Sequence, residues 1–541
     1  MSNRSYSFEA KHMDGKSEGH QQDKDIPLED DSTPTNGWTF KYILIMFSAY
    51  LTIPGISYTI SSLNAPTDLI KEFMNQTQYE RDGTWMDQDK VDSLFGLLVA
   101  LIGLGSAAGS MTASQLADCI GRKHAILVAS LSGIVGVVLM ALCRVTKSYE
   151  ILLVGRVITG VTLGWGYTIA PAYAVEMSQP SMRGSVALIN QLFQSFSFVI
   201  AQVMGYMELL GNDEHWHLLL GFPVIFFGLQ LIIFPFCPES PRYLLMKKND
   251  IAGATKALQT IRNKKDVSKD IALLHSELKD SATDAEVSVL QLFKSKILRR
   301  PLIIAIVMGL QQNWCGQNGI LFFSTQLFKS TGLSERNARY ATSGTGTTFF
   351  VFNLIAVLLL SRFGRKTLFQ FGVVGMAVCS GTVALTMVFQ EQVEALKYVN
   401  IVVSLMIIAF YSLGPICVFW VMLSELFPHS ARGTGFSIAI LCAMLGFFSH
   451  CYIFPLLLSK LDSYTFFVFC GIDLLMAIFV YFYVPETKNK TFAEIAKSWA
   501  PMESFDNPLT LSTSYNQEII VKGTDSTVFS ADETHEENKK F

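Results

Sequence analysis

The chain has few charged residues for its length. Asp, Glu, Lys and Arg together make up 16% of its 541 residues, whereas hydrophobic residues make up 50%, and the mean hydropathy is +0.34. A soluble chain of this length carries more charge on its surface. The formal net charge of −3 is also small, so the basic excess typical of nucleic-acid-binding proteins is missing. The composition predicts an integral membrane protein whose partner is the lipid bilayer and not a nucleic acid.

The sequence also lacks the patterns of a metal site, a disulfide framework or an active site. Its nine cysteines are scattered, without CxxC or metal-ligand spacing, which argues against bound zinc and paired disulfides. No nucleophile, base and orienting group can be picked out together, so we expect neither an enzyme nor a cofactor. The first 37 residues contain no apolar segment of the signal-peptide kind, and the first span is therefore expected to be its own insertion signal.

Long apolar runs dominate the chain instead. Each run is about 20 residues long, enough for a helix to cross about 30 Å of hydrocarbon. A polar segment near residues 240–299 divides the runs into six and six. The sequence therefore predicts an all-α membrane protein with twelve transmembrane helices. The runs lie near residues 40–62, 93–115, 125–143, 151–172, 185–207, 218–236, 301–325, 342–361, 368–389, 398–424, 433–457 and 464–484.

Three charged signatures occur twice, about 245 residues apart. A shared offset indicates one half-molecule written twice in the same orientation, the organisation of a transporter built from two bundles. Function is then expected between the halves. The repeated signatures are Gly121-Arg122-Lys123 with Gly364-Arg365-Lys366, Glu176 and Arg183-Gly184 with Glu425 and Arg432-Gly433, and Pro238-Glu239-Ser240-Pro241-Arg242 with Pro485-Glu486-Thr487-Lys488.

Lysine and arginine orient the helices, because short loops rich in them stay in the cytoplasm. The signature loops carry these residues, so both termini are predicted to be cytoplasmic. The loop near residues 63–92 is then external, and its Asn75-Gln76-Thr77 is a candidate glycosylation site. The expected domains are a disordered cytoplasmic tail (1–39), a six-helix bundle (40–236), a cytoplasmic helical linker (237–299), a second six-helix bundle (300–484) and a cytoplasmic tail (485–541).

Charged residues of the signatures lie where helices end and begin. Ion pairs between them can tie neighbouring helix ends together and act as a latch, although a simple signal for membrane orientation is the alternative. One exposed pair contributes only about 0–1 kcal/mol, but several together can bias two conformations. The candidate members are Asp118, Arg122, Arg156, Glu176, Arg183, Glu239, Arg242, Arg362, Arg365, Glu425, Arg432 and Glu486.

The seventh span holds five amide side chains in eight residues, from Gln311 to Asn318. A neutral amide both donates and accepts hydrogen bonds, which suits an uncharged polyol. The alternative is that the amides bond between helices. A break near Gly316 would let Gln312 and Asn318 face one cavity, since six residues of straight helix turn them about 120° apart. Asn313 and Gln317 are weaker candidates in the same run.

Two further spans supply candidates. Gln191 in the fifth span offers a facing amide from the first half, so that a substrate would bridge the bundles. Trp420 in the tenth span offers a flat apolar surface to a ligand, with packing as the alternative. Gly414 and Pro415 precede it, and proline removes a helical hydrogen bond, so a kink or hinge is expected there.

These residues together make the chain resemble the sugar porter branch of the major facilitator superfamily, and within it the animal facilitative hexose transporters, over about residues 40–500. The resemblance implies two six-helix bundles and uniport of a hexose or related neutral polyol, at the plasma membrane. Besides the signatures, it is carried by Asn64-Ala65-Pro66, the Asn75 site, Gly155-Arg156, Gln191, Gln312, Gly316, Asn318, Trp420 and Pro485-Glu486-Thr487-Lys488.

Departures from the family pattern bear on the substrate and on coupling. Phe349, Ala443, Met444 and Phe447 replace polar or indole side chains of the hexose transporters, which favours a less hydroxylated, larger or weakly bound ligand, or a different hexose. Proton-driven relatives have an Asp where this chain has Thr59, and a proton relay needs a titrating group. Uniport is therefore expected, with a proton-coupled sugar symporter or a transport-poor nutrient sensor as alternatives.

Overall fold

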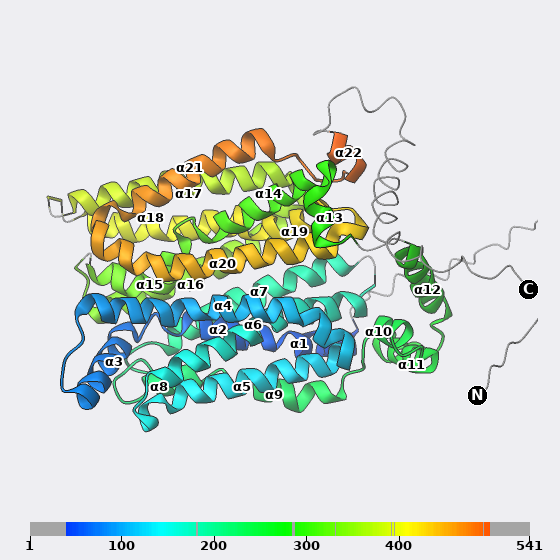
Figure 1. The fold of residues 1–541 in the computed structure, drawn as a ribbon, viewed down its shortest axis with the longest axis horizontal. Helices are drawn as coiled ribbons and strands as arrows, with labels where there is room; N and C mark the ends of the chain where they lie inside the picture. The colour runs from blue at the N-terminus through cyan, green and yellow to red at the C-terminus, as the bar shows by residue number, and fades with distance from the viewer. Residues whose placement is uncertain are drawn as a thin grey trace, which may run out of the picture. The chain divides into compact units, whose positions relative to one another are not determined.

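The computed structural model describes residues 39–179, 182–283, 287–330, 332–390, 392–393, 395–490 and 492–497. Every regular element within these ranges is helical, and Figure 1 shows the helices in two neighbouring groups. The predicted all-α class is therefore confirmed. Most of the tails expected over 1–39 and 485–541 falls outside the described residues.

The N-terminal bundle contains the first six spans. The first span is α1 (Phe40–Tyr50) followed by α2 (Thr52–Ser61), and a helix outside the spans, α3 (Thr67–Asp82), comes next. The remaining spans are α4 (Gln88–Ile120), α5 (Arg122–Thr146), α6 (Glu150–Met177), α7 (Arg183–Met204) and the pair α8 (Trp216–Gly221) and α9 (Val224–Ile233) with a 3₁₀ turn at Phe234–Phe236. The region near 63–92, expected to be a loop, thus contains a helix of 16 residues.

The segment between the two bundles contains four helices. They are α10 (Pro241–Met246), α11 (Ile251–Arg262), α12 (Ser268–Thr283) and α13 (Val289–Lys294). In Figure 1 they gather at the opposite end of the bundles from α3. We call these two ends the linker end and the α3 end.

The C-terminal bundle contains the other six spans, and two of them are interrupted. Its helices are α14 (Lys296–Asn313), α15 (Gln317–Ser330), α16 (Glu335–Arg362), α17 (Arg365–Phe389), α18 (Leu396–Tyr411), α19 (Cys417–Glu425), α20 (His429–Leu461) and α21 (Thr465–Tyr483), with α22 (Phe492–Lys497) after them. α14 and α15 form the seventh span. α18 and α19 form the tenth and are joined by a π-helical turn at Ser412–Ile416.

Nine stretches of described helix are long and apolar enough to cross a membrane. One of them, Ser430–Tyr483, contains two helices, α20 and α21. Together with α7 and the broken α14–α15 pair, the described helices make the twelve spans of the prediction. The chain is a multi-pass membrane protein.

Close packing of small residues holds the helices together. α4 packs on α6 within the N-terminal bundle, and across the bundles α4 packs on α20 and α7 on α16. A Cβ atom on Gly105 of α4 would lie 2.9 Å from the Cα of Gly160 on α6, so neither position has room for a side chain. Lipid offers no hydrophobic drive for helix association, which makes such contacts a principal source of stability.

Candidate functional site

The seventh span is broken at its centre. α14 ends at Asn313 and α15 begins at Gln317, and between them Gly316 has a φ of +77°. Residues with side chains disfavour this left-handed conformation, and a Cβ atom there would also lie 3.1 Å from the ring of Phe469. Glycine therefore lets the chain turn here, and the predicted break near Gly316 is confirmed.

Three amides hold the break in place. Asn313 Nδ2 donates to the main-chain oxygens of Ala443 at 2.8 Å and Gly309 at 3.2 Å, so it ties α14 to α20. Asn318 Nδ2 donates to the main-chain oxygen of Asn313 at 3.1 Å. Gln317 Nε2 donates across the break to the main-chain oxygen of Gln312 at 3.4 Å. These bonds are of the interhelical and local kind that the sequence left open as an alternative.

Other amide atoms of the same residues have no partner. Gln312 Oε1, Gln317 Oε1 and Gln191 Nε2 are buried and accept or donate no hydrogen bond within the described part of the chain. The two oxygens flank the break in the C-terminal bundle, whereas Gln191 belongs to α7 in the N-terminal bundle. Because buried polar atoms normally have partners, acceptors from one bundle and a donor from the other remain available to a ligand.

Aromatic side chains from the two bundles contact one another. Phe198 of α7 contacts Phe349 of α16 and Phe322 of α15, with ring centroids 5.5 Å and 6.3 Å apart. Phe322 also contacts Phe447 of α20 at 5.6 Å. Phe349 and Phe447 were expected to make the wall apolar, but Phe198 and Phe322 were missed, because isolated phenylalanines in apolar spans carry no distinguishing pattern.

The tenth span is distorted where the sequence predicted it. The π-helical turn contains Gly414 and Pro415, and the Gly414 Cα packs against α17, where a Cβ would lie 2.9 Å from the Cα of Gly372. Trp420 on α19 is half-buried and contacts Phe419 and Phe436, at 5.3 Å and 6.0 Å between ring centroids. These contacts support the packing alternative for Trp420.

Hydrogen bonds join the two bundles at the α3 end. Asn64 Nδ2 donates to the main-chain oxygen of Leu321 at 2.9 Å and to Ser324 Oγ at 2.8 Å. Gln202 Nε2 donates to Thr345 Oγ1 at 3.0 Å. These bonds run from the N-terminal bundle to α15 and α16, so the bundles are held together at this end.

Ion pairs add to the closure of the α3 end. Arg336 of α16 lies 2.8 Å from Glu208, in the loop after α7, and Lys329 pairs with Asp68 of α3. The main-chain amide of Glu208, the Tyr340 hydroxyl and Arg336 lower the pKa of the Glu208 carboxyl. Both carboxylates are exposed, and such pairs are readily broken and screened by salt.

Arg122 and Glu239 organise the linker end of the N-terminal bundle. The Arg122 guanidinium lies 2.9 Å from Asp118 and 3.3 Å from Glu176. Glu239 accepts the main-chain N–H of Lys123 at 3.0 Å, at the start of α5. A helix leaves its first N–H groups unpaired and carries a partial positive charge there, so this carboxylate stabilises the helix end.

The C-terminal bundle repeats the same arrangement. Arg365 lies 3.1 Å from Glu425, and Glu486 accepts the main-chain N–H of Arg365 at 2.8 Å, at the start of α17. Thr487 Oγ1 donates to Glu425, as Ser240 Oγ does to the matching glutamate of the first bundle. The glutamate contacts of the two bundles correspond, which confirms the duplication read from the sequence.

Several arginines of the expected latch have other partners, and the prediction is corrected for them. Arg183 lies 3.1 Å from Glu277 on α12 of the linker, not beside the glutamate that ends α6. Arg432 is exposed, and Glu425 pairs with Arg365 instead. In each bundle the glutamate pairs with the arginine that begins α5 or α17. Arg183 therefore pairs with the linker, and Arg432 faces solvent.

The other two signature arginines lie at the edge of this arrangement. Arg242, on α10, is half-buried. Arg362 is exposed, and its main-chain oxygen accepts from Lys488 Nζ at 2.8 Å. Neither forms a short ion pair within the described residues, although the charge of Arg242 acts on Glu176.

Arg156 does not belong to the linker-end set at all. It is fully buried in α6, where its guanidinium donates to the main-chain oxygens of Thr59 at 2.7 Å and Leu98 at 3.1 Å. Glu150, at the α3 end, begins the same helix, so Arg156 lies far along the chain from the linker end. The sequence analysis grouped Arg156 with the other arginines by its charge. Its hydrogen bonds instead join the fourth span to the first and the second.

Asp473 was missed by the sequence analysis. It lies in the middle of α21 with no exposed surface, and its Oδ1 accepts a hydrogen bond from Gln311 Nε2 at 3.2 Å. An ionisable residue inside an apolar span is a recognised signal of a functional or structural site, and that signal could have found it.

Fold and site together define the class of the protein. Two duplicated six-helix bundles, broken helices at mid-span and unpaired neutral amides from both bundles are features of a secondary transporter. Residues 45–499 match the family described as "Sugar (and other) transporter". The chain belongs to this family.

Similar proteins include facilitative transporters of animals. The chain is 34% identical over 442 residues to the facilitated glucose transporter member 3 of solute carrier family 2 from Canis lupus familiaris, covering 82% of this chain and 89% of that protein. It is 34% identical over 447 residues to member 5 from Homo sapiens, with the same coverage. An inward-open structure of the xylose transporter XylE from E. coli has a TM-score of 0.71 at 20% identity, covering 85% of this chain and all of that one, which is a likeness of fold.

Proposed function

We propose that the chain is a uniporter that carries a hexose or a related neutral polyol down its gradient by alternating access. The observation that carries the proposal is the set of buried, unpaired amide atoms, two beside the break in the seventh span and one on α7 of the other bundle. Membership in the sugar transporter family supports it. The relatives named as facilitated glucose transporters point to the same kind of solute.

The proposed site suits a neutral solute with several hydroxyl groups. One sugar hydroxyl can donate to Gln312 Oε1 or Gln317 Oε1 of the C-terminal bundle, and Gln191 Nε2 of the N-terminal bundle can donate to another. A second solute hydroxyl would reach the other bundle, so binding draws the bundles together. Phe349 and the aromatic residues around it offer apolar surface to the C–H faces of the ring. In this proposal Asn313 and Asn318 position the break, and Trp420 lines the path beside it.

Alternating access requires the bundles to part at one end and close at the other. The hydrogen bonds of Asn64 and Gln202 close the α3 end, and each such bond contributes only about 0.5–1.5 kcal/mol. The break at Gly316 and the kink at Gly414 and Pro415 are the proposed hinges. The paired contacts at the linker end keep the helix ends of each bundle together while the bundles move.

The structure supports uniport through the surroundings of Arg156. Its partner in the first span is the main-chain oxygen of Thr59, which cannot take up and release a proton during transport. The proton-driven relatives that the sequence resembles have an Asp there. A relay through this pair of helices therefore lacks its titrating group.

In the orientation that we propose, the protein lies in the plasma membrane, and its linker end and both termini face the cytoplasm. Asn75 then faces outward on α3, where its Oδ1 accepts the main-chain N–H of Met86 at 2.8 Å. Treating the protein expressed in animal cells with a deglycosylating enzyme tests this. We expect a mobility shift that Asn75→Gln abolishes, and no shift in the wild-type protein would contradict the proposed external position.

The function is tested by uptake into proteoliposomes. Labelled glucose, fructose, galactose and related polyols are compared with and without a proton gradient. We expect at least one sugar to equilibrate across the membrane, with no accumulation above equilibrium when the gradient is imposed. Accumulation driven by the proton gradient would replace uniport with symport. Absence of sugar uptake in folded protein would overturn the proposal.

A further inference from the structure

Asp473 and Gln311 form an isolated polar pair within the C-terminal bundle. Asp473 is fully buried and Gln311 is 5% exposed. One hydrogen bond, from Gln311 Nε2 to Asp473 Oδ1, joins them. Asp473 Oδ2 and Gln311 Oε1 are both buried and lack a partner among the described residues. The pair thus has one bond made and two acceptor oxygens left over.

No cation balances this carboxyl group within the described structure. The titratable side chains that interact with it are Cys315 at the helix break and Cys470 on α21. His450 on α20 reaches α21 through the ring of Phe469, at 5.3 Å. The basic residues that begin α17, Arg365 and Lys366, are engaged at the linker end. An isolated carboxylate in such surroundings is strongly disfavoured, because burial removes its water without supplying an opposite charge.

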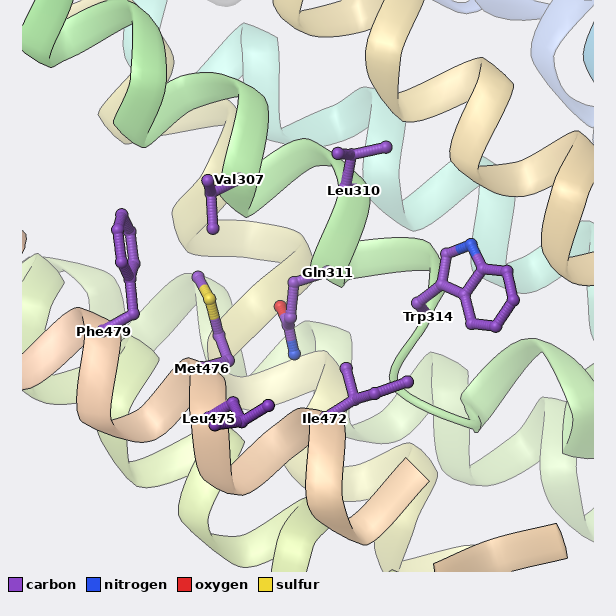
Figure 2. Close-up of a pocket in the computed structure, with 8 residues that line it drawn as sticks. All are labelled: Val307, Leu310, Gln311, Trp314, Ile472, Leu475, Met476 and Phe479. Carbon is purple, nitrogen blue, oxygen red and sulfur yellow. The ribbon is translucent and has the colours of Figure 1, made fainter. Parts of the chain in front are cut away.

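A cavity beside Gln311 is also lined by apolar residues. Figure 2 shows it on α14 with its side chain directed toward α21. It lines a cavity of about 500 Å³ together with seven apolar or aromatic residues. The cavity is lined by Val307, Leu310, Gln311, Trp314, Ile472, Leu475, Met476 and Phe479.

One proton would satisfy both oxygens at once. A protonated Asp473 Oδ2 donates to Gln311 Oε1, while Gln311 Nε2 continues to donate to Asp473 Oδ1. A carboxylic acid and a primary amide are complementary in this way, and the result is a closed ring of two hydrogen bonds. We propose that Asp473 is a resident proton-binding site, held as a neutral carboxylic acid in a two-point pair with Gln311.

The pair has a place in the architecture of the site. Gln311 directly precedes Gln312, and α14 ends shortly afterwards at Asn313. By joining α14 to α21, the acid–amide pair fixes the end of α14 and so positions the amides at the break. Asp473 is a positioning residue here, and its proton stays bound through the cycle. Its assignment does not depend on which solute is carried.

Infrared spectroscopy of the full-length protein in lipid tests the proton directly. At neutral pH exposed carboxyl groups are ionised, so a protonated carboxyl gives a separate C=O band. We expect this band in the wild type and its loss in Asp473→Asn. The control Asp462→Asn removes an exposed aspartate and is expected to keep the band. A wild-type spectrum without a band that Asp473→Asn removes would overturn the proposal.

Stability and transport give an independent readout. Asn can make both bonds of the pair, so Asp473→Asn is expected to keep the melting temperature and the transport rate of the wild type across neutral pH. Asp473→Leu and Gln311→Leu each leave a buried polar group unpaired, and are expected to lower the melting temperature by several degrees. The double Leu variant is expected to recover part of the loss. If Asp473→Asn is as damaged as Asp473→Leu, the carboxylate charge is needed and the proposal is wrong.

Discussion

Replacing Gly316 with alanine acts on the break in the seventh span. Gly316 has a φ of +77°, a conformation that costs a residue with a Cβ about 1–2 kcal/mol. The new Cβ would also lie 3.1 Å from Phe469, which must shift slightly. A change of about 1–2 kcal/mol corresponds to about 5–30-fold in an equilibrium. We therefore expect Gly316→Ala to populate the broken span about 5–30-fold less relative to alternative arrangements.

The assay combines initial uptake rates in proteoliposomes, at sugar concentrations below KM, with melting temperature in detergent. Uptake is expected to fall by up to that factor, and the melting temperature should fall as well. Gly228→Ala on α9 is the matched control. A Cβ there meets no atom within 4 Å, and alanine is favoured over glycine in a helix by about 0.5–1 kcal/mol. If both variants behave like the wild type, the break is not the source of the proposed geometry.

The remaining predictions concern the charged ends and the apolar wall. Arg365→Ala leaves the partly buried Glu425 without its cation, and we expect slower uptake with normal surface expression; unchanged uptake would show that the pair has no role. Phe349→Asn adds one possible hydrogen bond, worth about 0.5–1.5 kcal/mol, and should lower the KM for glucose by about 2- to 10-fold, whereas an unchanged KM would separate Phe349 from the substrate. Because its own main-chain amide, the Tyr340 hydroxyl and Arg336 lower the pKa of Glu208 in the folded protein, these contacts stabilise the α3 end above the ordinary Glu pKa, and the stabilisation is lost as external pH falls through the lowered value. The melting temperature should therefore fall less steeply with decreasing pH in Glu208→Gln than in the wild type, and equal slopes would contradict this role.

The large features of the fold could be predicted because they follow from strong, regular signals. The length of the apolar runs predicted the spans. The repeated signatures predicted the duplication, which the matched contacts of Arg122 and Arg365 confirm. The break at Gly316 was predictable too, since amides on both sides needed a common face. The helix α3 was not expected, because its polar sequence has neither the length nor the hydropathy of a span.

Partnerships between side chains were harder to predict. Arg183 and Arg156 carry the same charge as the latch residues, but only their three-dimensional positions assign Arg183 to Glu277 and Arg156 to main-chain oxygens. Asp473 and Gln311 are separated by 162 residues, and no pattern in either segment points to the other. Long-range pairing of this kind is set by packing, which a single sequence does not display.

The central claim is that the two bundles share one neutral sugar site. Sugar binding by Gln191→Ala, by Gln312→Ala and by the double variant tests it most directly, measured as equilibrium-exchange affinity in proteoliposomes. Gln326→Ala, which removes a half-buried amide from α15, is the control. We predict that each single variant binds the transported sugar about 2- to 10-fold more weakly, as expected for the loss of one hydrogen bond, and that the control binds normally. Wild-type affinity in both single variants and in the double variant would contradict a site shared between the bundles at the break.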